Sequence, residues 1–262
     1  MAVSRAYWSG GSEPSLDQPV VSQVGVASLG LYGGNRAAGA RKNEDGAIVW
    51  SGADWVLAVV LDGHGGSGSV NAMIDVLRDA ETPLLDPCEK GDFHALQQAL
   101  IQLLTGQQVA ARMGGVLGET ACLICYQRGA YLFWLSIGDN TLYLLHPELA
   151  ALGQHTLTVR NYYEWIGEHS SLSGTPPCFS TGIRQLRLGE NTILLVTDGI
   201  QEMPGRPFEP ASALAEEVGT TDNVGASLLR LLIRAHTAHA VDSCTLVGWS
   251  VNNPHPALTP SA

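Results

Sequence analysis

The sequence predicts an α+β fold in which two antiparallel β-sheets pack between layers of helices. The apolar runs 120–127 and 130–137 are joined by the short turn Arg128-Gly129, which is typical of a β-hairpin. The helical patterns come in two batches instead of alternating with strands, which argues against a parallel sheet. Of the 262 residues, 45% are hydrophobic, enough for the core of one large domain.

The N-terminal part of the chain contains an arm and three predicted strands. Residues 1–19 are rich in Gly, Ser and Pro, so we expect them to form an irregular arm. The moderately apolar residues 20–31 predict the first strand, and residues 47–50 predict the second. The apolar run 55–61 predicts a third, buried strand that delivers Asp62 to the edge of the core.

The third strand leads into the turn Asp62-Gly63-His64-Gly65-Gly66. Glycine lets a backbone turn sharply and lets a ligand approach it closely. The turn therefore combines a carboxylate, a bare backbone and a titratable imidazole, which together favour a chemical site. An ordinary Asp-Gly turn between two elements would give the same pattern, so this stretch alone does not decide between the two interpretations.

Two helices without an intervening strand are predicted next. The first follows from apolar residues at i, i+3, i+4 and i+7 over residues 70–77, and the second covers residues 92–112. Pro83 and Pro87 interrupt the chain between them. Residues 153–181 have no clear period, and a segment this long is often a functional loop. The remaining predicted elements are strands at 141–145, 184–188, 191–197 and 244–251 and helices at 210–218 and 222–238, the latter capped by Asp222.

Charge, cysteine positions and hydropathy argue against several classes of protein. With 14 Lys+Arg against 25 Asp+Glu, the net charge is −11, which argues against nucleic-acid binding through the overall field. Cys122 and Cys125 fall on a predicted strand, where positions three apart point to opposite faces, so we expect core cysteines and no zinc or redox pair. With no signal pattern and no apolar run of membrane-spanning length, we expect a cytoplasmic protein without a membrane partner.

Acidic residues recur at the ends of the predicted strands. Such carboxylates could gather at one rim of a sandwich, where they would repel one another unless cations neutralised them. Oxygen-rich sites of this kind suit Mg²⁺ or Mn²⁺. For any single acid, a turn or helix cap is the commoner explanation, and it is the recurrence that favours a metal centre. The acids are Glu44, Asp45, Asp62, Asp139, Asp198 and Asp242.

Six short motifs resemble, in their order along the chain, those of the metal-dependent type 2C protein serine/threonine phosphatases. The resemblance covers residues 20–251 and implies an αββα sandwich, preceded by the arm 1–19 and followed by a tail at 252–262. The motifs are Asn43-Glu44-Asp45, Asp62-Gly63-His64-Gly65-Gly66, Gly118-Glu119-Thr120-Ala121, Gly138-Asp139-Asn140, Val196-Thr197-Asp198-Gly199-Ile200 and Asp242-Ser243-Cys244-Thr245.

The resemblance implies hydrolysis of phosphoserine or phosphothreonine in a phosphorylated protein substrate, in one in-line step with two Mn²⁺ or Mg²⁺ ions. We expect the protein to be a monomer. Matching these motifs to the family's implies that Asp62 would bridge both ions, with Glu44 and the Gly63 carbonyl as further ligands of one ion and Asp198 and Asp242 as ligands of the other. Asp139 and Asp198 match the pair that binds a third ion in some members. Asp45 would position metal-bound water, and His64 would be the general acid.

The sequence departs from the family pattern where substrate phosphate would bind. Ala40 stands at the position of the usual arginine, which leaves Arg41 and Arg36 as candidates. The alternative is therefore a catalytically weak or inactive pseudophosphatase that binds a phosphoprotein or another partner. Hydrolysis of small phosphoesters is a third possibility. Residues 153–181 fall where the family carries its flap beside the cleft.

Overall fold

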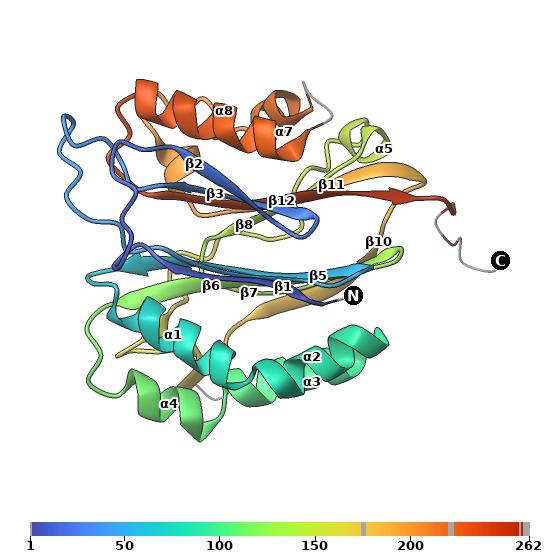
Figure 1. The fold of residues 1–262 in the computed structure, drawn as a ribbon, viewed down its shortest axis with the longest axis horizontal. Coiled ribbons are helices and arrows are strands. Elements are labelled where there is room, and N and C mark those ends of the chain that lie inside the picture. The colour runs from blue at the N-terminus through green and yellow to red at the C-terminus, as the bar shows by residue number, and fades with distance from the viewer. Residues whose placement is uncertain (1, 174–176, 220–222, 257, 259–262) are drawn as a thin grey trace.

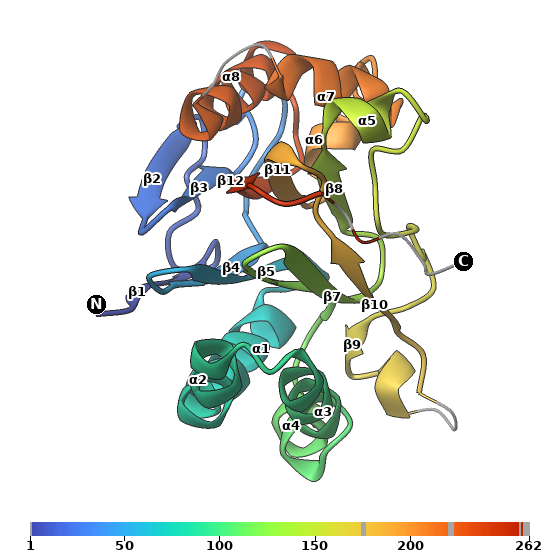
Figure 2. The ribbon, with the colours of Figure 1, turned by 90° about the vertical axis from the view of Figure 1, so that its right-hand side faces the viewer.

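The predicted sandwich of two sheets between helical layers is confirmed. The computed structural model describes residues 2–173, 177–219, 223–256 and 258. Two antiparallel sheets lie face to face in the described part of the chain, with helices α1 to α4 against the outside of one sheet and α7 and α8 against the outside of the other (Figures 1 and 2).

The first sheet has the strand order β1-β4-β5-β6-β7-β10, with β9 paired to β6. The predicted hairpin is present as β6 and β7. The prediction of an irregular arm was wrong for part of residues 1–19, because β1 pairs with β4 from Ser4 to Ser9 and buries Trp8 between the sheets. The strands are β1 (Ser4–Ser9), β4 (Gly46–Ser51), β5 (Trp55–His64), β6 (Glu119–Arg128), β7 (Tyr131–Ile137), β9 (Ile166–Gly167) and β10 (Ser180–Gln185).

The second sheet has the order β2-β3-β12-β11-β8. We predicted one strand over residues 20–31, but the chain forms a hairpin there, because Gly25 takes a φ of 61° and reverses the direction between β2 and β3. The strand predicted at 184–188 is β10, which begins earlier and ends at Gln185. The strands of this sheet are β2 (Val20–Val24), β3 (Ala27–Tyr32), β8 (Thr141–Leu145), β11 (Gly189–Val196) and β12 (Cys244–Asn253).

Residues 68–113, all of them described, form four helices where we predicted two. Pro83 does not interrupt the chain, because it lies in the first turn of α2, where a missing N–H costs no helical hydrogen bond. Pro87 lies inside α2, and Gly106 separates α3 from α4. The helices are α1 (Gly68–Asp79), α2 (Glu81–Lys90), α3 (Phe93–Leu104) and α4 (Gln107–Met113).

The other helical elements lie in the second half of the chain. The predicted cap Asp222 lies outside the described residues. Asn223 caps α8, since its side-chain oxygen accepts a 2.9 Å hydrogen bond from the Ala226 N–H. Within the described residues of the predicted loop 153–181 lie β9, the short 3₁₀ turn η1 (Ser171–Ser173) and the start of β10. The helices are α5 (Pro147–Ala150), α6 (Gly199–Glu202), α7 (Ala211–Val218) and α8 (Val224–Thr237).

The two cysteines of Cys122-x-x-Cys125 lie on β6 and are core residues. Cys122 packs in the apolar cluster under α1 to α4, whereas Cys125 packs between the two sheets. Both thiols are free and buried, and burial raises the pKa of Cys122 to about 12. Side chains on opposite faces of one strand cannot share a metal or form a disulfide. None of the described helices has the length and apolarity needed to cross a membrane.

Candidate metal centre

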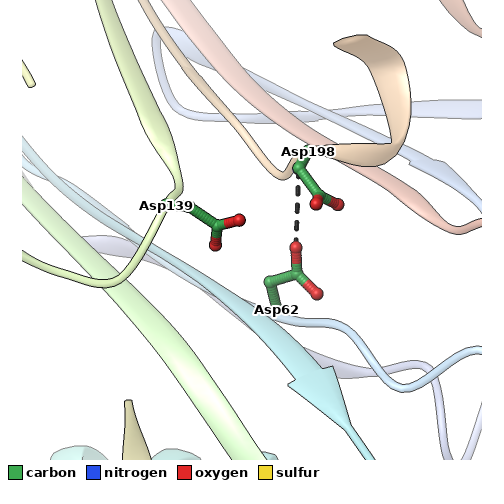
Figure 3. Close-up of side chains that lie close together, drawn as sticks. All are labelled: Asp62, Asp139 and Asp198. Carbon is green, nitrogen blue, oxygen red and sulfur yellow. Dashed lines mark hydrogen bonds between the residues drawn. The ribbon is translucent and has the colours of Figure 1, made fainter. Parts of the chain in front are cut away.

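Three carboxylates from the ends of strands meet at one edge of the sandwich. Asp62 lies near the end of β5, Asp139 lies between β7 and β8, and Asp198 lies between β11 and α6. Each offers an oxygen within 4.8 Å of the others' (Figure 3). The Asp198 N–H also donates a long 3.5 Å hydrogen bond to Asp62 Oδ2. Antiparallel strands from both sheets therefore converge on one acidic cluster.

Burial and mutual repulsion govern the charge of this cluster. The pKa of Asp62 is raised well above its ordinary value, first by burial and then by the charges of Asp45, Asp198 and Asp242. Burial, with the charges of Asp242 and Asp139, also raises the pKa of Asp198 to about 6. Carboxylates in this arrangement retain protons unless a cation compensates them. Because the cluster offers oxygen ligands at close range, it fits Mg²⁺ or Mn²⁺.

Asp45 is buried behind the cluster and is held by three hydroxyl groups. Its carboxylate accepts hydrogen bonds from Thr245 Oγ1 at 2.7 Å, Thr197 Oγ1 at 3.0 Å and Ser243 Oγ at 3.1 Å. Burial nevertheless raises the pKa of Asp45 to about 7. The hydroxyls come from the ends of β11 and β12, so Asp45 ties both strands to the start of β4. Sequence reasoning missed the three hydroxyls, although each lies within three residues of Asp198 or Asp242.

Glu44 and Asp242 lie around the cluster but outside the group of three. Asp242 reaches solvent, accepts a 2.9 Å hydrogen bond from the Ser243 N–H, and still influences the pKa of Asp62. Glu44 forms an ion pair with Lys42. A Cβ on Gly63 would lie 2.3 Å from the Glu44 carbonyl oxygen, so glycine at this position lets the end of β5 approach Glu44.

His64 borders a cleft beside the acids. Its Nδ1 lies 3.7 Å from Asp62 Oδ1, and 63% of its side chain is exposed. An exposed imidazole at the mouth of a cleft can exchange protons both with solvent and with a bound molecule. The cleft has a volume of about 340 Å³ and is lined by His64, Glu119, Ala121, Asp139, Asn161, Tyr162, Glu164, Trp165, Asp198 and Glu202.

The structure does not bring the two candidate phosphate-binding arginines to this cleft. Arg41 is exposed, and its Nη1 donates to the carbonyls of Ala40 at 2.9 Å and Arg36 at 3.2 Å. Arg36 is also exposed and lies 3.8 Å from Asp17. Neither arginine is among the described residues that line this cleft, so their assignment to substrate phosphate stays a prediction.

Arg160, which sequence reasoning missed, is the arginine that does reach the acids. Its Nη2 lies 3.3 Å from Asp139 Oδ2, 3.2 Å from Asp198 Oδ2 and 3.0 Å from Glu202 Oε1. It belongs to the long segment 153–181, which carries no periodic pattern. No local signal in the sequence therefore pairs Arg160 with acids 21 and 38 residues away.

Comparison with solved structures identifies the fold. No family model matches the sequence, and no curated protein matches it. A bacterial serine phosphatase bearing an arginine-to-alanine mutation aligns with a TM-score of 0.67 and 15% identity over 88% of this chain and 100% of its own. The Mycobacterium tuberculosis serine/threonine phosphatase PstP/Ppp aligns with a TM-score of 0.59 and 18% identity over 97% and 100% of the two chains.

Two similar structures contain metal ions. RsbX in complex with magnesium aligns with a TM-score of 0.60 and 12% identity over 89% of this chain and 100% of its own. The catalytic domain of PstP with two manganese ions aligns with a TM-score of 0.50 and 16% identity over 96% and 100%. At these identities the likeness concerns the fold, and this chain has the fold of the type 2C protein serine/threonine phosphatases.

Proposed function

We propose that this protein hydrolyses phosphoserine and phosphothreonine in proteins with the help of Mn²⁺ or Mg²⁺. The observation that carries the proposal is the cluster of Asp62, Asp139 and Asp198 at the edge of a cleft. The similarity of the fold to serine/threonine phosphatases, including one with two manganese ions, supports the same assignment.

The proposed ligands are the acids that surround the end of β5. Asp62 would contribute to both ions, with Glu44 and the Gly63 carbonyl at one and Asp198 and Asp242 at the other. When bound, two such ions supply a water nucleophile at neutral pH and compensate the charge of the phosphoryl group. The raised pKa values of Asp62 and Asp198 support this role, because burial, followed by the charges of neighbouring carboxylates, disfavours ionised acids that a bound cation would stabilise.

His64 and Asp45 have separate proposed roles. His64 would donate a proton to the leaving serine or threonine oxygen, and its exposed position beside the cleft supports this. Asp45 would orient the water that attacks phosphorus, and its three hydroxyl partners keep its carboxylate in one position. The segment 153–181, which contributes Tyr162 and Trp165 to the cleft, would contact the protein substrate.

Mn²⁺-dependent hydrolysis of an aryl phosphate and of a phosphothreonine peptide tests the proposal. We expect Asp62→Asn and Asp198→Asn each to lower kcat/KM by at least about 100-fold, because each removes charge that compensates the metal ions. Asp86→Asn is the matched control, since Asp86 is exposed on α2 and pairs with Lys90. We expect it to behave like the wild type.

The outcomes separate the enzyme from the pseudophosphatase. No hydrolysis by the wild type at millimolar Mn²⁺ would contradict the proposed activity. If the same protein bound a phosphothreonine peptide without turnover, the alternative of a phosphoprotein-binding module would take its place. Turnover of the aryl phosphate without turnover of the peptide would instead point to small phosphoesters as substrates.

A further inference from the structure

A single nitrogen of Arg160 faces three carboxylates at the edge of the candidate metal centre. Nη2 carries two hydrogens, yet Asp139, Asp198 and Glu202 all lie 3.0–3.3 Å from it. Two of these acids, Asp139 and Asp198, also belong to the cluster whose oxygens could hold a metal ion. The guanidinium therefore contributes positive charge to the carboxylates that a divalent cation would use.

The backbone around Arg160 fixes this position. Thr158 Oγ1 accepts a 2.9 Å hydrogen bond from the Leu142 N–H and donates at 3.2 Å to the Asn140 carbonyl. On the other side of Arg160, the Asn161 N–H donates at 3.1 Å to the Gly138 carbonyl. Both flanks of Arg160 are thus tied to the turn that carries Asp139, so the chain itself directs the arginine to the acids.

The contact has the geometry of an exchangeable ion pair. Arginine binds carboxylates most strongly with two parallel N–H groups, but here only Nη2 contacts the acids. Nε is buried and has no hydrogen-bond partner among the described residues. The guanidinium also lies 5.0 Å from the centre of the Tyr162 ring, and 21% of the side chain is exposed. It can therefore leave the acids toward the cleft without crossing the core.

We propose that Arg160 is a tethered counter-ion that competes with a divalent cation for Asp139 and Asp198. An ion enters this pair only when the guanidinium leaves, and occupancy by the ion releases the Arg160 side chain into the cleft that Tyr162 lines. The inference rests on the proposed function in that it assumes a metal centre at these carboxylates. The segment 153–181 thereby regulates how many ions the site holds at a given metal concentration.

Competition of this kind lowers the apparent affinity for the ion. If the guanidinium occupies the acids most of the time, the apparent dissociation constant rises in inverse proportion to the fraction of molecules in which the acids are free. Removing the guanidinium should thus tighten the weakest Mn²⁺ site by about tenfold or more. The substitution should also leave three uncompensated carboxylates in the metal-free protein. Mn²⁺ should therefore raise the melting temperature of the variant by more than it raises that of the wild type.

Calorimetric Mn²⁺ titration and thermal unfolding of the full chain test this inference. Arg160→Gln removes the charge, and we expect tighter binding at the weakest site and a larger Mn²⁺-induced rise in Tm. Arg160→Lys keeps the charge on a shorter, more mobile donor and should give intermediate values. Arg184→Gln is the matched control, because Arg184 donates to Gln154 at 2.9 Å and lies just beyond the same segment. It should match the wild type.

The outcomes distinguish failure of this inference from failure of the proposed function. If the wild type binds Mn²⁺ and Arg160→Gln gives the same isotherm and the same rise in Tm, Arg160 does not compete, while the metal centre stands. If neither protein binds Mn²⁺, both proposals fail. Mn²⁺ binding by Arg160→Gln with none by the wild type would support competition. A folded Arg160→Lys variant keeps the comparison valid if Arg160→Gln fails to fold.

Discussion

The position of His64 allows the effect of a substitution on catalysis to be measured apart from its effect on stability. It lies at the end of β5, largely exposed, and its nearest ionic partner is Asp62 at 3.7 Å. Substituting an exposed side chain of this kind removes little packing. A kinetic effect of its loss would therefore report on proton transfer, in contrast to Asp45, whose loss would also break three buried hydrogen bonds.

We expect His64→Gln to slow hydrolysis of a phosphothreonine peptide by about 10- to 100-fold, and that of an aryl phosphate by less than about threefold. The serine or threonine alkoxide needs a proton as it leaves, whereas an aryl oxide leaves readily without one. Steady-state kinetics on both substrates measure the difference, and the unfolding transition serves as the control for folding. Equal slowing of both substrates would contradict the role of His64 as the general acid.

Strand ends explain how the elements assemble the site. Asp62 lies in the last residues of β5, and Asp139 and Asp198 each lie two residues after the end of a strand, β7 and β11. Strand β12 begins two residues after Asp242. Strand β1 belongs to the same framework, because it covers the edge of β4, which directly follows Glu44 and Asp45. The N-terminal segment therefore supports the site, although it contributes no acid to it.

We expect Trp8→Ala in β1 to lower the free energy of unfolding by about 3–5 kcal/mol, because Trp8 is 7% exposed and packs between the sheets. Tyr163→Ala is the control: Tyr163 is 88% exposed on the segment 153–181, and its loss should change stability by less than about 0.5 kcal/mol. Urea unfolding measures both variants. A Trp8→Ala protein as stable as the wild type would show that residues 1–19 are dispensable for the core.

At the scale of the whole molecule, folding places several carboxylates in one low-dielectric region. Their raised pKa values mean that the native state binds protons that the unfolded state has released. For Asp45, the ordinary pKa is 3.8 and the folded pKa about 7. The stabilising contribution of the protonated form is complete below the ordinary value and is lost as the pH rises through about 7.

We therefore expect the metal-free protein to lose stability as the pH rises from about 4 to about 7, by an amount on the order of a few kcal/mol. Urea unfolding in the presence of EDTA, repeated across this range, measures the loss. Asp45→Asn should flatten the profile, since it removes one titrating group. Mn²⁺ should stabilise the protein more at about pH 7 than at about pH 5, because metal ligands must be deprotonated. Stability that increased with pH in EDTA would contradict this account.

Local sequence patterns predicted much of the fold but not its interruptions. The hairpin β6–β7, the buried strand before Asp62 and the amphipathic face of α8 follow from periodicity, which is a property of consecutive residues. The turn at Gly25 and the helical position of Pro83 were missed. Glycine and proline each occur in more than one kind of backbone structure, so neither residue type alone shows which one is present. Strand β1 was missed because pairing with β4, which lies far along the chain, overrides its weak local preference.

The sequence by itself determined that Asp62 and Asp198 lie at the edge of a core, because a hydrophobic run ends at each of them. Only the tertiary structure decided how the charges are compensated. It brought Arg160 to Asp139 and Asp198 and surrounded Asp45 with hydroxyls. The physical reason is that a strand end is encoded locally, whereas the partner of a charge is set by residues that meet only after the two sheets have packed together.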